Sequence, residues 1–523
     1  MPSMKGLPNE ADFVVIGAGV AGLRAAIELA RAGQVVVLGK KETLDPHAPG
    51  ADGAGLSDED EVILHLQDTL IAGDGLCVPD AAKTLVDEAP GRIEEIIDWG
   101  AHLVKGGTKL VFGSESAHSR NRMLNAQGDS TRRETLRALH AKAQTLKNIA
   151  LHDSDFSTEL ETEDGCVTGV SLITEKGLPQ EISCSAVLLA TGGMGQLYRN
   201  TTNPEGATGD GIAMAFRAGA EVSDMEFVQF HPTALYVKKA PHFLLSDALR
   251  GEGAYLRNIE MDRFMAKYHP MAEQAPDDLV ARAIMHEMEV SHARDAFVYL
   301  DLTHLKASQV QKHFSRIYAT CLQYNIDITE DLIPVRPAAH YSVGGVRTDL
   351  NGKSNLAGLY AAGEAASTGV HGANRFPSNS LLEGLVYGAR AGKAMREELK
   401  RPRKPINSPK MAASQNGPVD AGVEELIGQI QDITWKDAGI VRTRVGMQDA
   451  LKKLEALAPR VARPRTKRAW EGANLHLLGS LVVRAALARV ESRGAHYRTD
   501  YPMHDDKKFL KHSVIKGDQL RFA

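Results

Sequence analysis

Residues 12–40 read DFVVIGAGVAGLRAAIELARAGQVVVLGK, and this stretch decides the fold. The run FVVIG is apolar throughout, which predicts a strand buried on both faces, and QVVVLG predicts a second such strand. Between them, Val20–Arg31 repeats its apolar residues at helical spacing. A strand, a helix and a strand in so short a segment favour an α/β fold with a parallel sheet.

The turn between the first strand and the helix has the glycine spacing G-x-G-x-x-G. The first glycine permits a tight turn, the second lets the backbone approach a pyrophosphate, and the third lets the helix pack on the strand. Phosphates then bind the free N–H groups at the start of the helix. The pattern predicts a dinucleotide-binding turn made of Gly17, Ala18, Gly19, Val20, Ala21 and Gly22.

The second strand ends in Gly39-Lys40, with no Asp or Glu to accept a hydrogen bond from an adenosine ribose. This departure weakens the case for NAD more than the case for FAD. Two further apolar runs end in glycine-rich turns, SAVLLATGGMG at Ser185–Gly195 and LAGLYAAGEAAS at Leu356–Ser367. In flavoproteins built from two dinucleotide-binding halves, such turns return to hold one FAD.

Segments so far apart in the chain imply a discontinuous, Rossmann-like FAD-binding domain, for which we expect residues 1–220 and 337–400. Residues 221–336 would form an inserted α+β capping domain, with PDDLVARAIMHEM as one of its helices. Residues 401–420 are rich in proline and polar residues and predict a linker. Helical periodicity with few strand signals then predicts a C-terminal helical bundle over residues 421–523.

Composition excludes several classes of function. The chain has 61 basic and 66 acidic residues in 523, a net charge of −5, so nucleic acid and anionic membranes are poor partners. The longest apolar runs are far shorter than the ~20 residues that span a bilayer. The N-terminus shows neither an export nor an import pattern, and we expect a cytoplasmic protein. Four cysteines stand singly, so we expect no disulfide, zinc site or iron–sulfur cluster.

Several segments then become specific. ATGGMGQLYRNTTNPEGATGDGIAMAFRAGA, MEFVQFHPTAL, LSDALRGEGAYL, DDLVARAI, PAAHYSVGGV, GLYAAGEAASTGVHGANRFPSNSLLEGLVYG and ESRGAHYRTDYP resemble, in order, the succinate dehydrogenase/fumarate reductase flavoprotein family. Within the family the chain is most similar to the branch that oxidises L-aspartate. The resemblance covers nearly the whole chain.

The resemblance implies a site that binds both carboxylates of a small dicarboxylate substrate, L-aspartate or fumarate. Arg375 matches the arginine that clamps one carboxylate, a task suited to a bidentate guanidinium. His231 and His340 match the histidines that bond the carboxylates, and Gln229, Ser246 and Ser378 match neighbouring polar contacts. Arg282 matches the arginine that donates or accepts the proton. Because arginine is a poor base in water, that role requires a buried, strongly perturbed environment.

The choice between amine oxidation and succinate chemistry depends on FGSESAHSRNRMLNAQGD, residues 112–129. It resembles the stretch in which the aspartate branch has a glutamate facing the substrate ammonium, and Glu115 takes that place. Succinate has no ammonium, so a buried carboxylate there would lack a partner. The alternative is an exposed loop glutamate.

The segment Asp45–Asp60 departs from the tight loop that family members place over the flavin. His47 falls where the membrane-complex members bond covalently to FAD, but we expect a chance loop histidine and noncovalent FAD. The altered loop also leaves open a flavin-binding homologue with impaired catalysis. The other alternative is the flavoprotein subunit of a fumarate reductase or succinate dehydrogenase.

Motif by motif, the resemblance adds further cofactor contacts, namely Lys40, Asp210, Glu364, Asn374, Ser380 and Leu381. Glu364 would accept from the ribose and compensate for the acid missing after Gly39, whereas Asp210 has an alternative role as a helix N-cap. The implied reaction transfers a hydride from Cα to flavin N5, gives iminoaspartate, and passes electrons to O₂ or fumarate. It would be the first step of NAD biosynthesis through quinolinate, with a functional coupling to quinolinate synthase.

Overall fold

The computed structural model describes residues 6–40, 54–55, 59–106, 109–110, 112–113, 119–120, 122–124, 126, 131–238, 240, 243–292, 296–400 and 422–523. Its central element is a parallel sheet with the strand order β19-β12-β1-β2-β8. The two strands expected from the opening motif are β1 (Phe13–Ile16) and β2 (Val35–Leu38), and both are buried along their whole length. The other strands are β12 (Ala186–Leu189), β19 (Leu359–Ala361) and β8 (Ile149–His152).

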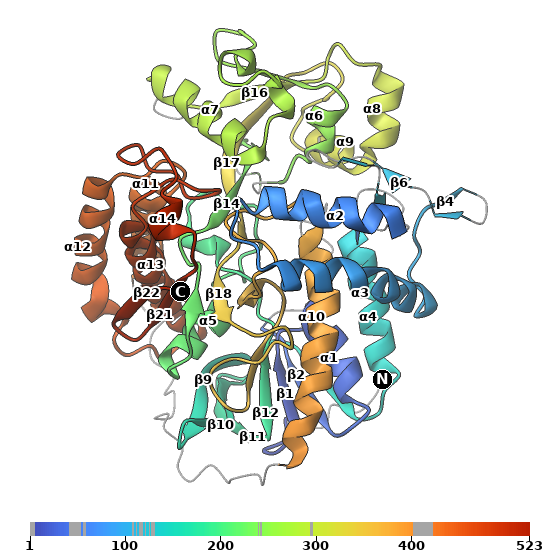
Figure 1. The fold of residues 1–523 in the computed structure, drawn as a ribbon, viewed down its shortest axis with the longest axis vertical. Helices are drawn as coiled ribbons and strands as arrows, with labels where there is room; N and C mark the ends of the chain where they lie inside the picture. The colour runs from blue at the N-terminus through green and yellow to red at the C-terminus, as the bar shows by residue number, and fades with distance from the viewer. Residues whose placement is uncertain are drawn as a thin grey trace.

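Helices cover one face of this sheet. The expected helix is α1 (Val20–Leu29), and it packs against α10 (Asn379–Met395), with α3 (Pro79–Asp98) and α4 (Thr131–Gln144) beside them (Figure 1). Their apolar side chains form one large buried cluster with β1, β2 and β12. Glycine lets α1 and α10 approach closely, because a Cβ on Gly388 would lie 2.5 Å from the carbonyl oxygen of Ala21.

The opposite face is covered by an antiparallel sheet and a short helix. The sheet consists of β9 (Phe156–Glu163), β10 (Cys166–Ile173) and β11 (Pro179–Ser183), and the helix is α5 (Asp210–Arg217). A second apolar cluster fills the space between this layer and the parallel sheet. The parallel sheet is therefore packed between these two layers.

The inserted segment forms a separate lobe at the top of Figure 1. Its sheet has the order β14-β17-β16-β15, with strands Val228–Leu235, Ile333–Ser342, Val298–Asp301 and Tyr255–Arg257. The helices of the lobe are α6 (Ala248–Gly251), α7 (Asp277–Val290), α8 (Ala307–His313) and α9 (Ser315–Leu322). Strands β14 and β17 connect this lobe with the domain built on the parallel sheet, here called the cofactor domain. They contain most of the segments MEFVQFHPTAL and PAAHYSVGGV.

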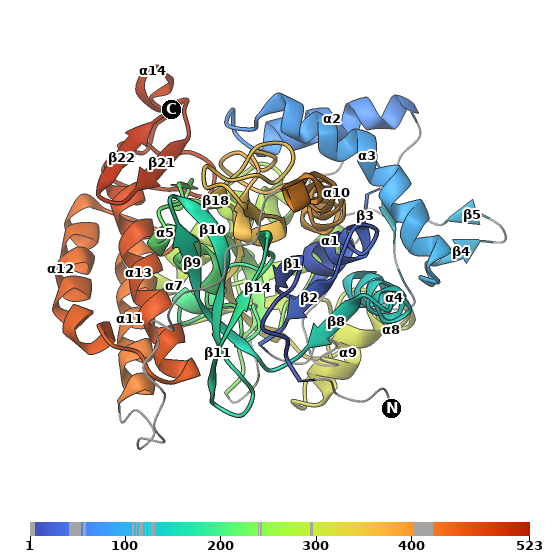
Figure 2. The same cartoon turned by 90° about the horizontal axis from the view of Figure 1, so that it is seen from below.

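The C-terminal segment contains the expected helices, α11 (Val423–Ala438), α12 (Arg444–Val461) and α13 (Lys467–Ala488), followed by α14 (Asp506–Phe509). It also contains a hairpin that the sequence did not indicate, β21 (Ser513–Lys516) and β22 (Gln519–Phe522). The hairpin completes a sheet of order β20-β18-β13-β21-β22, whose other strands are Ala366–Ser367, Gly345–Arg347 and Val222–Ser223. Figure 2 shows this lobe beside β9 and β10.

The remaining elements are short, apart from α2 (Glu59–Ala72). The small strands are β3 (Ala54–Gly55), β4 (Lys105–Gly106), β5 (Lys109–Leu110), β6 (Phe112–Gly113) and β7 (Met123–Leu124). The 3-10 turns are Gly195–Leu197, Met265–Lys267, Ala272–Gln274, Gly363–Ala365 and Arg396–Lys400. Within the described part of the chain, every helix is too short or too polar to cross a lipid bilayer.

Candidate active site and cofactor cavity

Two glycines of the glycine-rich turn, Gly17 and Gly22, leave no room for a side chain. Gly17 has φ +111°, and a Cβ there would lie 2.1 Å from the carbonyl oxygen of Ala190. A Cβ on Gly22 would lie 1.9 Å from the carbonyl oxygen of Gly17, whereas Gly19 faces open space. Helix α1 begins at Val20, so the first N–H groups of the helix face the same space as Gly19. This arrangement suits a phosphate group.

A cavity of about 750 Å³ lies at the carboxyl ends of β1, β2, β12 and β19. This is the size and position at which doubly wound sheets bind dinucleotides. Ten of the expected cofactor contacts line it, namely Gly17, Ala18, Gly19, Val20, Ala21, Lys40, Asp210, Glu364, Ser380 and Leu381. Gly22 packs behind the turn, and Asn374 lines a different pocket. The glycine cradle, the helix start and the cavity together fit FAD.

At the end of β2, the side chain of Lys40 contacts two carboxylates from other parts of the chain. Its ammonium donates to Thr208 Oγ1 at 2.6 Å, Asp210 Oδ2 at 2.6 Å and Glu471 Oε1 at 2.8 Å. Burial opposes the charge, but the two carboxylates outweigh it, and the pKa of Lys40 is raised. The N-cap of α5 is Gly209, so Asp210 is not the cap that we considered.

Glu364 lies elsewhere in the cavity. It follows β19, which is separated from β2 by β12 and β1, so it is not beside Gly39 and does not replace the missing acid there. Its Oε1 accepts from the backbone N–H of Ser342 at 2.9 Å. Burial raises the pKa of Glu364 to about 7.

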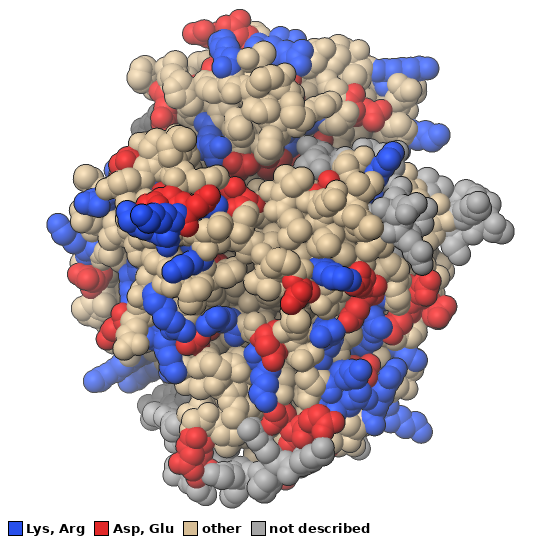
Figure 3. Space-filling view, viewed as in Figure 1, with Lys and Arg blue, Asp and Glu red and all other residues tan. Residues whose placement is uncertain are grey.

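A second pocket, of about 400 Å³, lies between α2, the start of α7, the HGANR loop and the C-terminal segment. The space-filling view shows a hollow below the inserted lobe with charged side chains in it (Figure 3). Four expected site residues line this pocket, namely Gln229, Arg282, Asn374 and Arg375. His340 instead lines the cofactor cavity.

Arg375 connects the two spaces. Its Nε donates to Gln229 Oε1 at 2.9 Å, its Nη1 donates to Ser380 Oγ at 3.2 Å, and its guanidinium lies 5.0 Å from the centre of the Tyr341 ring. Ser380 and Tyr341 line the cofactor cavity, and Gln229 lines the second pocket. Arg375 is only 6% exposed, yet no carboxylate among the described residues forms an ion pair with it. A buried guanidinium of this kind is a ready site for a carboxylate ligand.

The Tyr341 ring, which lies against Arg375, belongs to a buried polar cluster that sequence reasoning missed. The Tyr341 hydroxyl donates to Glu383 Oε2 at 2.7 Å, and Thr368 donates to the other oxygen at 2.6 Å. His371 Nε2 lies 3.1 Å from Glu383 Oε2. Burial opposes ionisation, but His371 and the hydrogen bonds outweigh it, and the pKa of Glu383 is lowered. The only signal in the sequence was the position of these residues inside the motifs that resemble the family.

The two candidate histidines lie together, with ring centres 5.6 Å apart. His340 Nδ1 contacts Thr202 Oγ1 at 2.9 Å. Both nitrogens of His231 have protein partners, because Nδ1 accepts from Thr233 N–H at 3.2 Å and Nε2 lies 2.9 Å from Asp247 Oδ1. A contact between His231 and a substrate therefore requires that its bond to Asp247 be exchanged.

Asp247 belongs to a buried network with Arg250 and Asp277. The Arg250 guanidinium contacts both carboxylates. His231, Asp247 and Asp277 also place three potential metal ligands within 4.8 Å of one another. Because a guanidinium already binds both acids, the arrangement is an ion network and does not suggest a metal site. The LSDALRGEGAYL segment contains Asp247 and Arg250 of this network, and the DDLVARAI segment contains Asp277.

Arg282 lies on α7 and faces the C-terminal segment. Its Nη1 donates to Asp278 Oδ2 at 2.8 Å, and its guanidinium lies 4.8 Å from the centre of the Tyr497 ring. The side chain is 25% exposed, so the deep burial expected for a proton-transferring arginine is not present in this arrangement.

The remaining expected residues are more peripheral or outside the described range. Ser246 Oγ accepts from Ala248 N–H at 3.3 Å, and Ser378 has φ +68° immediately before α10. Neither is among the residues that line the two cavities. Glu115 and His47 lie outside the described residues, as does most of the Asp45–Asp60 segment.

The fold and the cavity define a flavoprotein with a discontinuous FAD-binding domain. Residues 12–381 match the model of an FAD binding domain, and residues 428–522 match that of the fumarate reductase flavoprotein C-terminus. The chain belongs to the succinate dehydrogenase/fumarate reductase flavoprotein family and binds FAD.

Relatives of known activity are similar along their whole length. The L-aspartate oxidase of Streptomyces coelicolor is 40% identical over 97% of this chain and 91% of its own. That of Pseudomonas aeruginosa is 38% identical over 94% and 95%. Among solved structures, a quinol–fumarate reductase with menaquinol superimposes with a TM-score of 0.88 at 30% identity, over 98% of each chain. The Mycobacterium smegmatis protein Sdh1 gives a TM-score of 0.84 at 31% identity, over 98% and 94%.

Proposed function

We propose that this chain is an FAD-dependent L-aspartate oxidase that forms iminoaspartate. One observation carries the proposal, namely the buried Arg375 guanidinium, which has no described carboxylate partner and lies between the cofactor cavity and the second pocket. It offers a carboxylate-binding group next to the place where FAD fits. The full-length similarity to L-aspartate oxidases supports the choice of substrate.

The residues take distinct roles in this proposal. Arg375 binds one substrate carboxylate, and its bonds to Gln229 and Ser380 fix the plane of the guanidinium. His340, on the cavity wall, donates to the other carboxylate, with His231 beside it. Binding of both carboxylates fixes the orientation of the substrate Cα, which is the main requirement for hydride transfer from that carbon. FAD supplies a two-electron acceptor when it is bound.

In this proposal Arg282 accepts the proton that the substrate ammonium loses when iminoaspartate forms, which requires its guanidinium to be neutral beforehand. Its present bond to Asp278 and its contact with the Tyr497 ring hold it in the lining of the second pocket, which Arg375 also lines. The role requires Arg282 to exchange these partners for the substrate. Glu115 would face the substrate ammonium, a role inferred from the resemblance.

Anaerobic mixing tests the proposal directly. Purified protein with bound FAD is mixed with L-aspartate or with succinate, and the visible flavin absorbance is followed. We expect L-aspartate to bleach the flavin rapidly and succinate to bleach it slowly or not at all. Bleaching by succinate alone would instead assign the chain to the second candidate function.

That second candidate is fumarate reduction or succinate oxidation, and the TM-score of 0.88 with a quinol–fumarate reductase favours it. The two candidates differ in the expected attachment of the cofactor. We expect noncovalent FAD, so acid precipitation should release yellow cofactor into the supernatant. A yellow pellet whose mass is raised by one FAD would point to covalent attachment through His47 and to the second candidate.

The wider setting is part of the proposal and rests on the resemblance alone. It comprises a place in NAD biosynthesis through quinolinate, a functional coupling to quinolinate synthase, and a cytoplasmic location. The coupling is testable by measuring quinolinate formation with both purified proteins present, compared with the two reactions run in separate compartments.

A further inference from the structure

The first turns of α13 lie against the cofactor cavity, although this helix belongs to the C-terminal lobe. Helix α13 packs on α5, the helix that begins with Asp210 (Figure 2). Glu471 accepts from Lys40, and Asn474 Nδ2 donates to Asp210 Oδ1 at 2.8 Å. Residues three apart share one face of a helix, so a single face of α13 contacts both charged residues at this end of the cavity.

These contacts engage all three N–H donors of Lys40 and both carboxylate oxygens of Asp210. The three N–H donors of Lys40 match its three oxygen partners, Thr208, Asp210 and Glu471. The Asp210 carboxylate accepts from Lys40, from Thr208 and from Asn474. Both side chains are therefore fixed in position by their neighbours.

Only two of these four residues line the cavity. Lys40 and Asp210 line it, whereas Glu471 and Asn474 are not among the lining residues and lie behind them. The Glu471 side chain is 13% exposed and Asn474 is 1% exposed, so neither contact is an ordinary surface pair. The two carboxylates that contact Lys40 at the end of β2 therefore come from α5 and α13.

We infer that helix α13 is part of the FAD site, with Glu471 and Asn474 as positioning residues for Lys40 and Asp210. Binding of FAD and docking of the C-terminal helices then stabilise each other, because a coupling between two equilibria is reciprocal. The inference concerns the cofactor and does not depend on which dicarboxylate the enzyme oxidises.

A titration of apoprotein with FAD, followed by quenching of flavin fluorescence, tests this inference. Glu471→Gln keeps the shape of the side chain and removes its charge, and we expect the Kd for FAD to rise about tenfold, which corresponds to about 1.4 kcal/mol. Asn474→Ala should produce a smaller rise. The matched control is Glu424→Gln, because Arg468 bonds both Glu424 and Glu471 but Glu424 is exposed and does not contact Lys40. The control should bind FAD as the wild type does.

A double-mutant cycle separates positioning from a general loss of structure. If Glu471 acts through Lys40, then Glu471→Gln has little further effect on FAD affinity once Lys40→Met is present. An equal loss in both backgrounds, or a wild-type Kd for Glu471→Gln, would overturn the inference. If the Glu471 variant does not fold, Asn474→Ser tests the same inference through Asp210, and a wild-type Kd for that variant would equally overturn it.

Discussion

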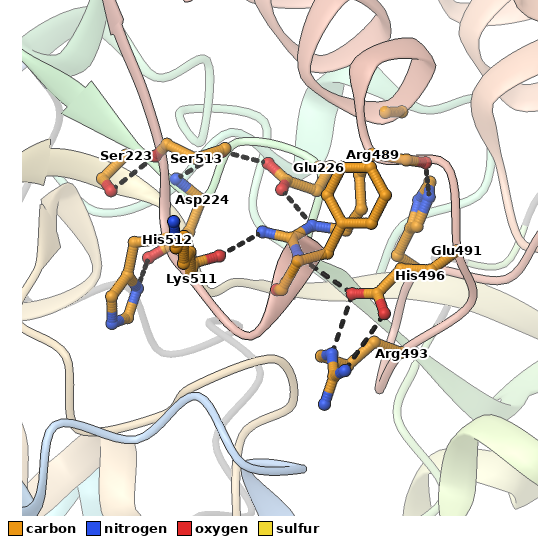
Figure 4. Close-up of polar contacts among 12 residues, drawn as sticks. Ser223, Asp224, Glu226, Arg489, Glu491, Arg493, His496, Lys511, His512 and Ser513 are labelled. Carbon is orange, nitrogen blue, oxygen red and sulfur yellow. Dashed lines mark hydrogen bonds and ion pairs between the residues drawn. The ribbon is translucent and has the colours of Figure 1, made fainter. Parts of the chain in front are cut away.

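Two buried arginines in this molecule have opposite surroundings. Arg489 is fully buried and bonds Glu226 Oε1 through Nε at 2.7 Å and Glu491 Oε1 through Nη1 at 3.0 Å (Figure 4). Arg375 is almost as deeply buried, but its described partners are an amide, a hydroxyl and an aromatic ring. Removing one partner of a buried ion pair destabilises the fold, whereas a buried guanidinium without a described carboxylate partner is a candidate to bind an anionic ligand.

The neutralised arginine sits where the lobes meet. Glu226 precedes β14, and its second oxygen accepts from Ser513 Oγ at 2.6 Å. His512 Nδ1 contacts Asp224 Oδ2 at 2.7 Å in the same cluster (Figure 4). These bonds fasten the end of the chain to the base of the inserted lobe. The ESRGAHYRTDYP segment therefore contributes structural ion pairs as well as residues that line the second pocket.

The largest expected effect is that of Arg489→Met on stability. It leaves Glu226 buried without its cation, so we expect the free energy of unfolding to fall by about 3–5 kcal/mol. Denaturant unfolding of apoprotein measures this. Arg199→Met, which removes an exposed pair with Asp432, should cost about 0–1 kcal/mol. A loss below 1 kcal/mol for the Arg489 variant would contradict the structural role.

Arg375→Lys should have the opposite signature. Lysine keeps the charge but loses the planar fork, and losing one charge-assisted bond costs about 1.5–3 kcal/mol. We expect kcat/KM for L-aspartate to fall roughly tenfold to a hundredfold, with flavin content and Tm close to those of the wild type. Unchanged kinetics would remove Arg375 from the carboxylate clamp.

Glu115→Gln tests recognition of the substrate ammonium separately from recognition of the carboxylates. Without the charge pair, use of L-aspartate should weaken, while use of succinate should hold or improve. We expect the ratio of kcat/KM for the two substrates to change by about tenfold, or about 1.4 kcal/mol. Equal losses for both substrates would mean that Glu115 supports only the fold.

The smallest expected effect concerns the pH dependence of the structural cluster. Asp224 raises the pKa of His512, although burial opposes the charge. A raised pKa means that the pair stabilises the fold fully below the ordinary histidine pKa of about 6.5, and that this contribution is lost as pH rises through the folded value. In denaturant unfolding, the free energy of unfolding of the wild type should exceed that of His512→Gln by roughly 1 kcal/mol at pH 6 and by almost nothing at pH 9. A difference that does not depend on pH would show that the charge of His512 is not involved.

Elements with a local signal were predictable. The β1-α1-β2 unit, α7 and the helices α11 to α13 follow from apolar periodicity and glycine spacing, which depend on neighbouring residues alone. The first two turns of α13 give a weaker apolar signal than the rest of the helix, because KRAWEGAN is polar on the side that contacts the cofactor domain. The hairpin β21–β22 was missed because its strands are only four residues long and because β21 pairs with β13, which lies about 290 residues earlier in the chain.

The glycine turn beside the cofactor cavity could be predicted from the sequence alone, because it depends on one short segment, and the polar residues expected to bind a dicarboxylate stay a prediction from short motifs. Only the tertiary structure decided which charges find partners. Lys40 and Glu471 are 431 residues apart in the chain, yet their atoms lie 2.8 Å apart. No local pattern encodes such a pairing, because it depends on how three lobes pack. The same packing neutralises Arg489 and gives Arg375 no carboxylate partner among the residues that the structure describes.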